Sequence, residues 1–360
     1  MQIGIVGLPL AGKTTIFSTL MKHKSSETGY HRQEAERGIV KVPDARLDRL
    51  TAIFNPKRQV NATIEYVKVP GFEGDGKEPK GLPAQFIGNL KTVDAMLLVV
   101  RDFENAMYPH PFGRLDPAKD LEFINSEFWL SDLALVESRV ERLEKNAAKI
   151  KDPQNQKDLA LMKRCKAQLD QEKPLRELEL TAEEERALKG YQFLTLKPVL
   201  YVINISEGKI PAAAEIEQSL SRFVTPNCAL TSLSAEIERE ISELSAADAA
   251  VFMADLGIAE PALHKLIRTS YELLGLISFF TAGEDECRSW TIGAGANAQQ
   301  AAGVIHSDLE KGFIRAETVH YDDLIKHGSF NACKEKGLLR LEGKEYIVKD
   351  GDILNIRFNV

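Results

Sequence analysis

Apolar runs separated by stretches of helical period organise the first hundred residues of the chain and recur near residue 200. Residues 95–100 and 199–203 are continuously apolar, and residues 63–69 alternate between apolar and polar positions. Residues 3–6 form another apolar strand pattern, which leads through a glycine-rich stretch into a helical stretch at residues 14–22. Continuous apolar runs are typical of parallel strands covered on both faces. Strands alternating with helices therefore predict a doubly wound α/β sheet.

Residues 131–174 have a different period, which predicts two helices. Apolar residues recur there at alternating spacings of three and four, as along one seam of a coiled coil: Leu133, Val136, Val140, Leu143, Ala147 and Ile150. We expect a turn at residues 151–156. The apolar positions of the second helix are Leu161 or Met162, Cys165 and Leu169. A short connection predicts an antiparallel helical hairpin, inserted in an α/β domain made of residues 1–130 and 175–276.

The capping-box pattern of Thr181 and Glu184 predicts the start of the helix that leads back into this domain. From residue 277 onwards the hydrophobic pattern predicts short strands at 290–292, 313–316, 346–348 and 353–358, and a helix at 298–310. A hairpin-type turn is expected at residues 349–352. Residues 277–360 are therefore expected to form a small α+β domain.

Composition excludes several classes of protein. The 360 residues are 44% hydrophobic and 28% charged, with a formal net charge of -7. This balance gives no general attraction to nucleic acid, and nothing points to DNA. The four cysteines lack metal-ligand spacing, which favours a reducing compartment. No apolar run of about eighteen residues is present and the N-terminus has no signal pattern, so we expect a cytoplasmic protein without a membrane span.

The glycine-rich stretch at residues 7–14 carries the clearest chemistry. It fits the pattern GxxxxGK[ST] directly after a strand and before a helix, which is the context of a phosphate-binding P-loop. Lys13 would reach the β- and γ-phosphates, and the Thr14 hydroxyl would bind Mg²⁺. The alternative, a plain glycine-rich turn, does not account for this context. The expected phosphate-binding residues are Gly7, Leu8, Pro9, Leu10, Ala11, Gly12, Lys13, Thr14 and Thr15.

Two later segments stand where a GTPase places its base-recognition loops. Asn204 and Glu207 follow the strand pattern at 199–203, at the position of the NKxD motif. Ser234 and Ala235 follow a strand pattern near residues 229–232, at the position of an SAK-type loop. Each tetrapeptide by itself is also compatible with a turn at a strand end. Their order behind a P-loop favours nucleotide binding.

These motifs together resemble the YchF family of Obg-related P-loop NTPases. The resemblance runs from end to end, through GIVGLP, GKTT, VPDARLDRL, TIEYV, the Asn-x-x-Glu element, FTAG, IHSDLEKGFIRAE and YIVKDGDILNIRFNV. It implies a helical hairpin insertion, a C-terminal β-grasp-like TGS domain, and association with ribosomes or RNA. It also implies a preference for ATP with tolerance of GTP, because the family has Glu at the position of Glu207. The chemistry of a carboxylate alone leaves the choice of base open.

The resemblance also assigns hydrolytic positions, and some of them are altered. A family histidine thought to assist hydrolysis matches His110, whose alternative role is that of an exposed loop residue. Gly71 is the glycine of the switch II DxxG motif, but Lys68 replaces the aspartate and Arg32 replaces the switch I threonine. We therefore expect nucleotide binding with slow hydrolysis at best, in a regulatory protein. The alternative is a binding module that does not hydrolyse its nucleotide, while a metabolic kinase would need an acceptor site that the sequence does not show.

Overall fold

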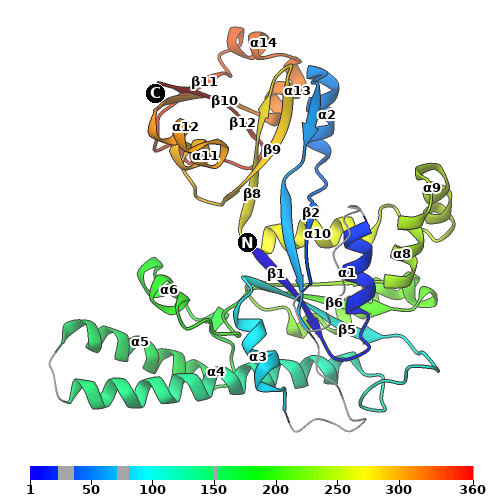
Figure 1. The fold of residues 1–360 in the computed structure, drawn as a ribbon, viewed down its shortest axis with the longest axis vertical. Helices are drawn as coiled ribbons and strands as arrows, with labels where there is room; N and C mark the ends of the chain where they lie inside the picture. The colour runs from blue at the N-terminus through cyan, green and yellow to red at the C-terminus, as the bar shows by residue number, and fades with distance from the viewer. Residues whose placement is uncertain (23–35, 71–80, 149–151, 360) are drawn as a thin grey trace. The chain divides into compact units, whose positions relative to one another are not determined.

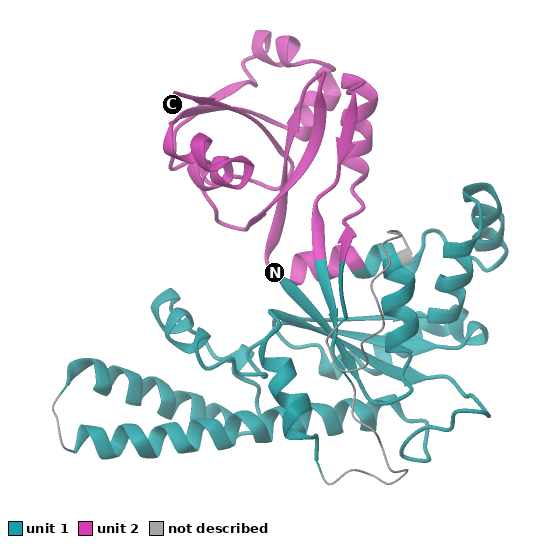
Figure 2. Cartoon of the chain, viewed as in Figure 1, with its two compact units in different colours: residues 1–38, 65–266 teal, residues 39–64, 267–360 magenta. Residues whose placement is uncertain are grey.

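The computed structural model describes residues 1–22, 36–70, 81–148 and 152–359. The chain forms two compact units (Figure 2). Unit 1 comprises Met1–Gly38 and Glu65–Leu266, and unit 2 comprises Ile39–Ile64 and Ile267–Val360. Among the described helices, none is both long and apolar enough to cross a bilayer.

Unit 1 is built on a six-stranded sheet in the order β2-β4-β1-β5-β6-β7 (Figure 1). Its strands are β1 (Gln2–Gly7), β2 (Glu36–Lys41), β4 (Thr63–Lys68), β5 (Ala95–Asp102), β6 (Val199–Ile205) and β7 (Cys228–Leu233). The pairs β1–β4, β1–β5, β5–β6 and β6–β7 are parallel. Every residue of β5 and β6 is buried, which explains their unbroken apolar sequences. The doubly wound α/β sheet expected from the sequence is therefore confirmed.

Helices connect or follow these strands. They are α1 (Lys13–Lys22), α3 (Ala84–Lys91), α4 (Pro117–Ala147), α5 (Pro153–Leu169), α6 (Ala182–Lys189), α7 (Ala213–Ser219), α8 (Ala235–Glu243), α9 (Ala246–Asp255) and α10 (Ala262–Leu273). Of these, α4, α5, α6, α8 and α9 each follow a residue whose side chain caps the helix. The predicted capping box is present: Thr181 accepts a hydrogen bond from the Glu184 backbone, and the Glu184 side chain accepts one from Thr181. The last helix, α10, spans the boundary of the two units.

The expected hairpin is formed by α4 and α5, which lie side by side as a projection from the sheet (Figure 1). Both Leu161 and Met162 are buried in its core, together with Val136 and Cys165. The helix α4 begins at Pro117, well before residue 131. Its N-terminal half places Leu121, Ile124 and Phe128 in the core of the sheet, and its C-terminal half places Val136 and Leu143 in the core of the hairpin.

The prediction of a turn at residues 151–156 is wrong for residues 153–156, because α5 begins at Pro153. Proline is favoured in the first turn of a helix, where its missing N–H costs nothing. Asp152 supplies the cap by accepting a hydrogen bond from the Gln154 backbone N–H at 3.1 Å.

Unit 2 contains a second six-stranded sheet, in the order β11-β10-β12-β8-β9-β3. Its strands are β3 (Arg58–Val60), β8 (Leu276–Ala282), β9 (Glu286–Gly293), β10 (Phe313–His320), β11 (Arg340–Glu342) and β12 (Asp352–Phe358). Its remaining helices are α2 (Ala45–Phe54), α11 (Ala298–Ile305), α12 (Ser307–Lys311), α13 (Tyr321–His327) and α14 (Phe330–Glu335). The C-terminal domain read from the sequence is thus present as a mixed α+β fold.

Three details of unit 2 differ from what the sequence predicts. Residues 39–64 belong to it, because β3 pairs with β9 and Leu47 and Leu50 of α2 share a core with Phe280. The helix expected at 298–310 is broken at His306, whose φ of -163° is extended. Residues 346–348 form no strand and contribute only an isolated bridge from Ile347 to Asn297.

Candidate functional site

The P-loop connects β1 to α1 and contains backbone conformations that favour glycine. Gly7 has φ of 148°, and a Cβ there would lie 2.2 Å from the carbonyl oxygen of Val99. Gly12 has φ of 96°, and its Cβ would lie 2.1 Å from the Asn204 side chain. No side chain fits either position, so the two glycines let the loop approach β5 and Asn204 closely. Leu10, between them, also lies in the left-handed region with φ of 61°.

Lys13 folds back over this loop. Its Nζ donates hydrogen bonds to the carbonyl oxygens of Gly7, at 3.0 Å, and Leu8, at 2.7 Å. Burial, together with the nearby positive charge of Lys68, lowers the pKa of Lys13 to about 8. A phosphate group would supply the negative charge that restores the ordinary pKa of this lysine.

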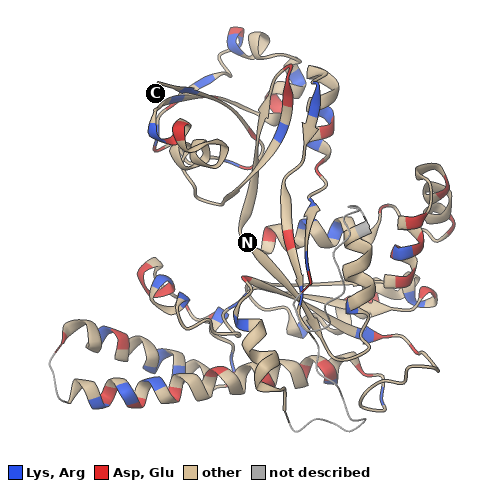
Figure 3. Ribbon diagram, viewed as in Figure 1, with Lys and Arg blue, Asp and Glu red and all other residues tan. Residues whose placement is uncertain are grey.

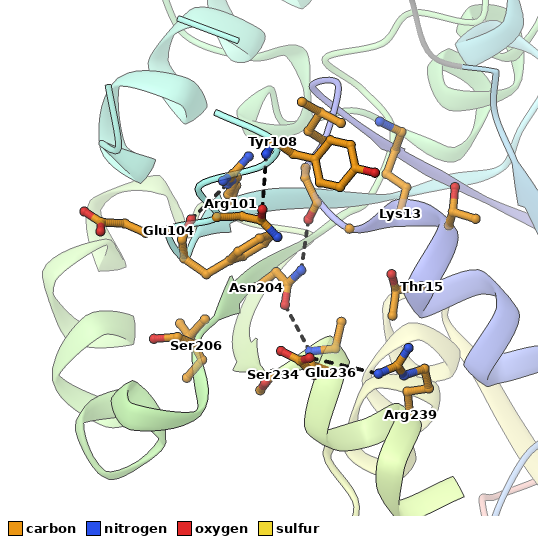
Figure 4. A pocket seen from close by; sticks show the side chains of 18 residues that line it. Lys13, Thr15, Arg101, Glu104, Tyr108, Asn204, Ser206, Ser234, Glu236 and Arg239 are labelled. Atoms are coloured by element: carbon orange, nitrogen blue, oxygen red, sulfur yellow. Dashed lines mark hydrogen bonds and ion pairs between the residues drawn. The ribbon is translucent and has the colours of Figure 1, made fainter. Parts of the chain in front are cut away.

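Asn204 ties three sequence motifs together. Its Nδ2 donates a hydrogen bond to the carbonyl oxygen of Ala11 at 3.0 Å, and its Oδ1 accepts one from the backbone N–H of Ala235 at 3.0 Å. Ser234 caps the N-terminus of α8. Because β1, β6 and β7 are parallel, their carboxyl ends meet at one edge of the sheet, as Figure 4 shows for the residues around Asn204. The sequence elements at 7–15, 204–207 and 234–235 are therefore brought to one place.

A pocket of about 440 Å³ opens at this edge (Figure 4). Nine of the expected residues line it: Leu10, Ala11, Gly12, Lys13, Thr14, Thr15, Asn204, Ser234 and Ala235. The other P-loop residues, Gly7, Leu8 and Pro9, precede the lining part of the loop. Glu207 is exposed and follows the lining residue Ser206. Gly71 and Arg32 lie outside the described residues.

Half of the pocket wall was missed by the sequence analysis. It consists of Arg101, Phe103, Glu104, Asn105, Tyr108, Ile205, Ser206, Glu236 and Arg239. The first five belong to the end of β5 and the loop that follows it. The sequence does indicate this loop, because residues 95–100 are predicted to form a parallel strand, and the loops that follow such strands lie beside ligands. The residues of this loop match no sequence motif that indicates nucleotide binding.

His110 is neither exposed nor part of the pocket lining. Its side chain is 6% exposed, and its Nδ1 accepts a hydrogen bond from the backbone N–H of Phe112 at 3.2 Å. The Nε2 therefore carries the proton and donates to Asp120 Oδ2 at 2.8 Å. Arg114 donates to the other oxygen of Asp120 at 3.0 Å. Burial raises the pKa of Asp120, while His110 and Arg114 oppose that rise.

Lys68 ends β4, next to Ile5 of β1. Its Nζ pairs with the carboxylate of Glu36 and lies 5.8 Å from the centre of the Phe17 ring. The side chain is 20% exposed, so it is not a strand-end lysine directed into solvent. No cluster of three or more potential metal ligands from His, Cys, Asp or Glu occurs in the part of the chain that the structure describes.

Family models and relatives match this arrangement. A model described as 50S ribosome-binding GTPase matches residues 2–134, and a model of the C-terminal part of YchF GTPases, described as a protein of unknown function, matches residues 276–359. "Ribosome-binding ATPase YchF" of Bacillus subtilis (strain 168) is 41% identical over 362 residues, which cover 99% of each chain. The protein of the same name from Escherichia coli O157:H7 is 41% identical over 361 residues, covering 100% of this chain and 99% of the relative.

Solved structures agree with these sequence matches. The Schizosaccharomyces pombe YchF GTPase superimposes with a TM-score of 0.88 at 32% identity, covering 99% of this chain and 97% of that one. A GTP binding protein from Pyrococcus horikoshii OT3 has a TM-score of 0.62 at 16% identity over the full length of both chains, which supports the fold alone. With a P-loop tied to its base-side loops by Asn204 and relatives that match from end to end, this nucleotide-binding chain belongs to the YchF family.

Proposed function

We propose that this chain binds ATP or GTP together with Mg²⁺, hydrolyses it slowly, and acts as a regulatory protein that associates with the ribosome in the cytoplasm. The observation that carries the nucleotide part is the Asn204 bridge from the P-loop to the backbone of Ala235. This bridge links the phosphate loop to the base-side loop through one side chain. Preorganisation of this kind reduces the free-energy cost of binding.

Mg²⁺ would be held by the hydroxyl of Thr14 and by the phosphates of the nucleotide. A bound Mg²⁺ neutralises part of the phosphate charge and orients the phosphate groups. The described residues fit it incompletely, because Lys68 stands where the family resemblance places a carboxylate, and its ammonium group is paired with Glu36. We therefore expect nucleotide binding to depend less on Mg²⁺ than it would with aspartate at position 68.

The choice of base rests on Glu207. Guanine offers two donors on its N1 and N2 edge that a carboxylate can accept, whereas adenine lacks both. Glu207 begins the short helix Glu207–Ala212 and is exposed beside the pocket. Relatives are named both as ATPases and as a GTPase. We propose that this chain accepts both bases and binds adenine nucleotides at least as well as guanine nucleotides.

Ribosome association is proposed from the names of the relatives. Positively and negatively charged residues are interspersed along the hairpin of α4 and α5 (Figure 3). We propose that this hairpin and the C-terminal domain from residue 277, which carries the TGS resemblance, form the partner-facing surface. Neither surface is needed for the pocket, whose lining residues come from 10–15, 101–108, 204–206 and 234–239.

The test is a calorimetric titration of the full chain with ATP, GTP and their diphosphates, with Mg²⁺ and with EDTA. Saturable binding of ATP or GTP is expected, and its absence under all conditions would refute the proposed function. Co-sedimentation with purified ribosomes, with and without nucleotide, tests the partner separately. Full-length protein that remains in the supernatant in every nucleotide state would remove the ribosome proposal.

A second candidate is a binding module that uses nucleotide only to fix a conformation. Two observations favour it: Lys68 is paired with Glu36, and His110 is held by Asp120 outside the pocket lining. Neither group is placed to assist attack by water in this conformation. Turnover measured at saturating ATP and Mg²⁺ separates the two candidates, because a binding module would show no phosphate release above the rate without protein.

A further inference from the structure

Arg101 is a buried arginine in the wall of the nucleotide pocket. It lies near the end of β5, two residues after Val99, which pairs with Gly7 of the P-loop. On its other side β5 pairs with β6, where Arg101 is the direct partner of Asn204. The residue is 3% exposed and lines the pocket together with the P-loop. Figure 4 shows it on the same side of the pocket as Tyr108 and Glu104.

The guanidinium of Arg101 is only partly satisfied. Its Nε donates to the carbonyl oxygen of Phe103 at 2.9 Å, and its Cζ lies 4.5 Å from the centre of the Phe103 ring. Its Nη1 is buried and has no hydrogen-bond partner, and no described carboxylate forms an ion pair with this arginine. Burial lowers the pKa of Arg101, with no opposing contribution from an acidic group.

Arg176, another buried arginine of unit 1, differs from Arg101 in its hydrogen bonding. Arg176 donates Nε to the carbonyl oxygen of Lys197 at 3.2 Å and Nη2 to that of Leu194 at 3.5 Å. Its Nη1 lies 3.5 Å from the sulfur of Cys228. All three guanidinium nitrogens of Arg176 therefore have an acceptor within the protein, whereas Nη1 of Arg101, a residue that lines the pocket, has none. A buried cation without a counter-charge is destabilising, so its presence at a site is explained when a ligand supplies the counter-charge.

We propose that Arg101 is a further nucleotide-binding residue, whose Nη1 donates a hydrogen bond to a phosphate oxygen of the bound nucleotide. The proposal rests on the proposed function. The base and the ribose are uncharged, so among the groups of a nucleotide only the phosphates provide the missing negative charge. The pairing of Val99 with Gly7 places the end of β5 alongside the loop that binds those phosphates. Phe103 fixes the orientation of the guanidinium plane, because its ring stacks on the guanidinium and its carbonyl oxygen accepts a hydrogen bond from Nε of Arg101.

The experiment compares Arg101→Met with Arg222→Met in the full chain. Arg222 is a matched control, because its guanidinium also stacks on the phenylalanine that follows it, at 5.0 Å from the Phe223 ring, but it is exposed and outside the pocket lining. Affinities for ATP, ADP and AMP are measured by calorimetry. Thermal unfolding of each variant is followed with and without saturating ATP. Arg101→Lys, which keeps the charge, is the conservative variant.

We expect Arg101→Met to weaken ATP and ADP binding by between about tenfold and a hundredfold, as loss of a charge-assisted hydrogen bond should. The unfolding temperature without nucleotide should stay the same or rise, while the increase produced by ATP should shrink. Arg101→Lys should recover part of the affinity, and Arg222→Met should behave as wild type.

A purely structural role makes the opposite prediction. If Arg101→Met lowers the unfolding temperature without nucleotide and leaves the affinities unchanged, the inference is wrong. A loss of affinity that Arg101→Lys does not recover at all would also overturn it, because the contact would then be independent of the positive charge of the side chain. Wild-type protein that binds no nucleotide would refute the proposed function instead.

Discussion

The two sides of the nucleotide site differ in what their side chains touch. On the binding side, Lys13 and Asn204 contact the P-loop itself, and the residues from Leu10 to Thr15 line the pocket. On the side expected to assist hydrolysis, Lys68 pairs with Glu36 and His110 pairs with Asp120. The binding groups are therefore bonded to backbone groups within the site, whereas the hydrolytic groups are paired with carboxylates and do not line the pocket. Binding and hydrolysis can thus be separated in one fold, and five experiments test how far that separation goes.

The largest effect is expected for Lys13→Ala. This change removes a buried cation aimed at the phosphates, so ATP affinity should fall by about a hundredfold or more. Calorimetry gives the affinity, and the far-ultraviolet circular dichroism spectrum checks that the variant is folded. Unchanged affinity would contradict the P-loop assignment.

The next effect is expected for Lys68→Asp. The change replaces charge +1 by -1 near the phosphate site, and each unit charge acts on a dication at about 6 Å with roughly 5 kcal/mol at an effective dielectric near 20, before screening. Lysine movement absorbs much of this energy. We expect ATP affinity to become more dependent on Mg²⁺ by about tenfold or more, together with faster turnover.

Lys68→Met serves as the control for this change, because it removes the pairing with Glu36 without adding a carboxylate. It should not gain the dependence on Mg²⁺. Wild-type protein that hydrolyses ATP briskly with Mg²⁺, and an aspartate variant that is no better, would show that Lys68 does not limit the reaction.

The third effect is a dependence on pH. Because the pKa of Lys13 in the free protein is about 8, a bound phosphate should raise it. ATP affinity should then be about tenfold lower at pH 9 than at pH 7, since binding at high pH requires proton uptake. The stability of the free protein should change with pH in the opposite direction. The pKa of Lys13 is 10.5 in the unfolded chain and about 8 in the folded protein, so the free energy of unfolding should rise between pH 8 and pH 10.5.

Lys13→Arg is the matched variant for the pH experiment, because arginine keeps its charge over this range. Its ATP affinity should be independent of pH between 7 and 9, whatever its absolute value. A wild-type affinity that is also flat over this range would mean that Lys13 is not the group that titrates.

The fourth effect concerns His110→Ala. The variant leaves the buried carboxylate of Asp120 with one partner fewer, so the free energy of unfolding should fall by about 1–3 kcal/mol. ATP affinity should change by less than about twofold, because His110 does not line the pocket. Denaturant unfolding and calorimetry measure the two quantities. A large loss of affinity with unchanged stability would place the imidazole in the pocket during binding.

The smallest effect is expected at Glu207. Its carboxylate is exposed, so Glu207→Ala should change ATP affinity by less than about threefold, or under 1 kcal/mol. GTP affinity should fall if the carboxylate accepts hydrogen bonds from guanine. Competition titrations with both nucleotides measure the preference. A wild-type preference for GTP of about tenfold would show that this glutamate recognises guanine as an aspartate does.

Ribosome experiments should use the intact chain. Deleting residues 277–360 would remove β8 and β9, against which β3 and the buried Leu47 and Leu50 of α2 are packed. The remaining residues 39–64 would then expose an apolar face. Substitutions on the surface of the hairpin or of unit 2 test the partner-facing proposal without this loss of core.

Much of the fold was predictable because local patterns and tertiary contacts agree. The apolar runs at 95–100 and 199–203 became the buried strands β5 and β6, and the seam from Leu133 onwards became the hairpin core. Boundaries were less predictable. Pro153 was assigned to a turn although it begins α5, and α2 joined unit 2 because its apolar face fits that core and not through any local signal.

The sequence by itself predicts which residues would bind phosphate, because a P-loop depends on glycines and a lysine at fixed spacing along one loop. It also determined the family, through motifs spread over the whole chain. Only the tertiary structure decided what Arg101, Lys68 and His110 contact. Their partners, Phe103, Glu36 and Asp120, are chosen by strand register, burial and loop path. The sequence specifies which side chains are charged, but folding decides which oppositely charged or hydrogen-bonding groups lie close enough to pair with them.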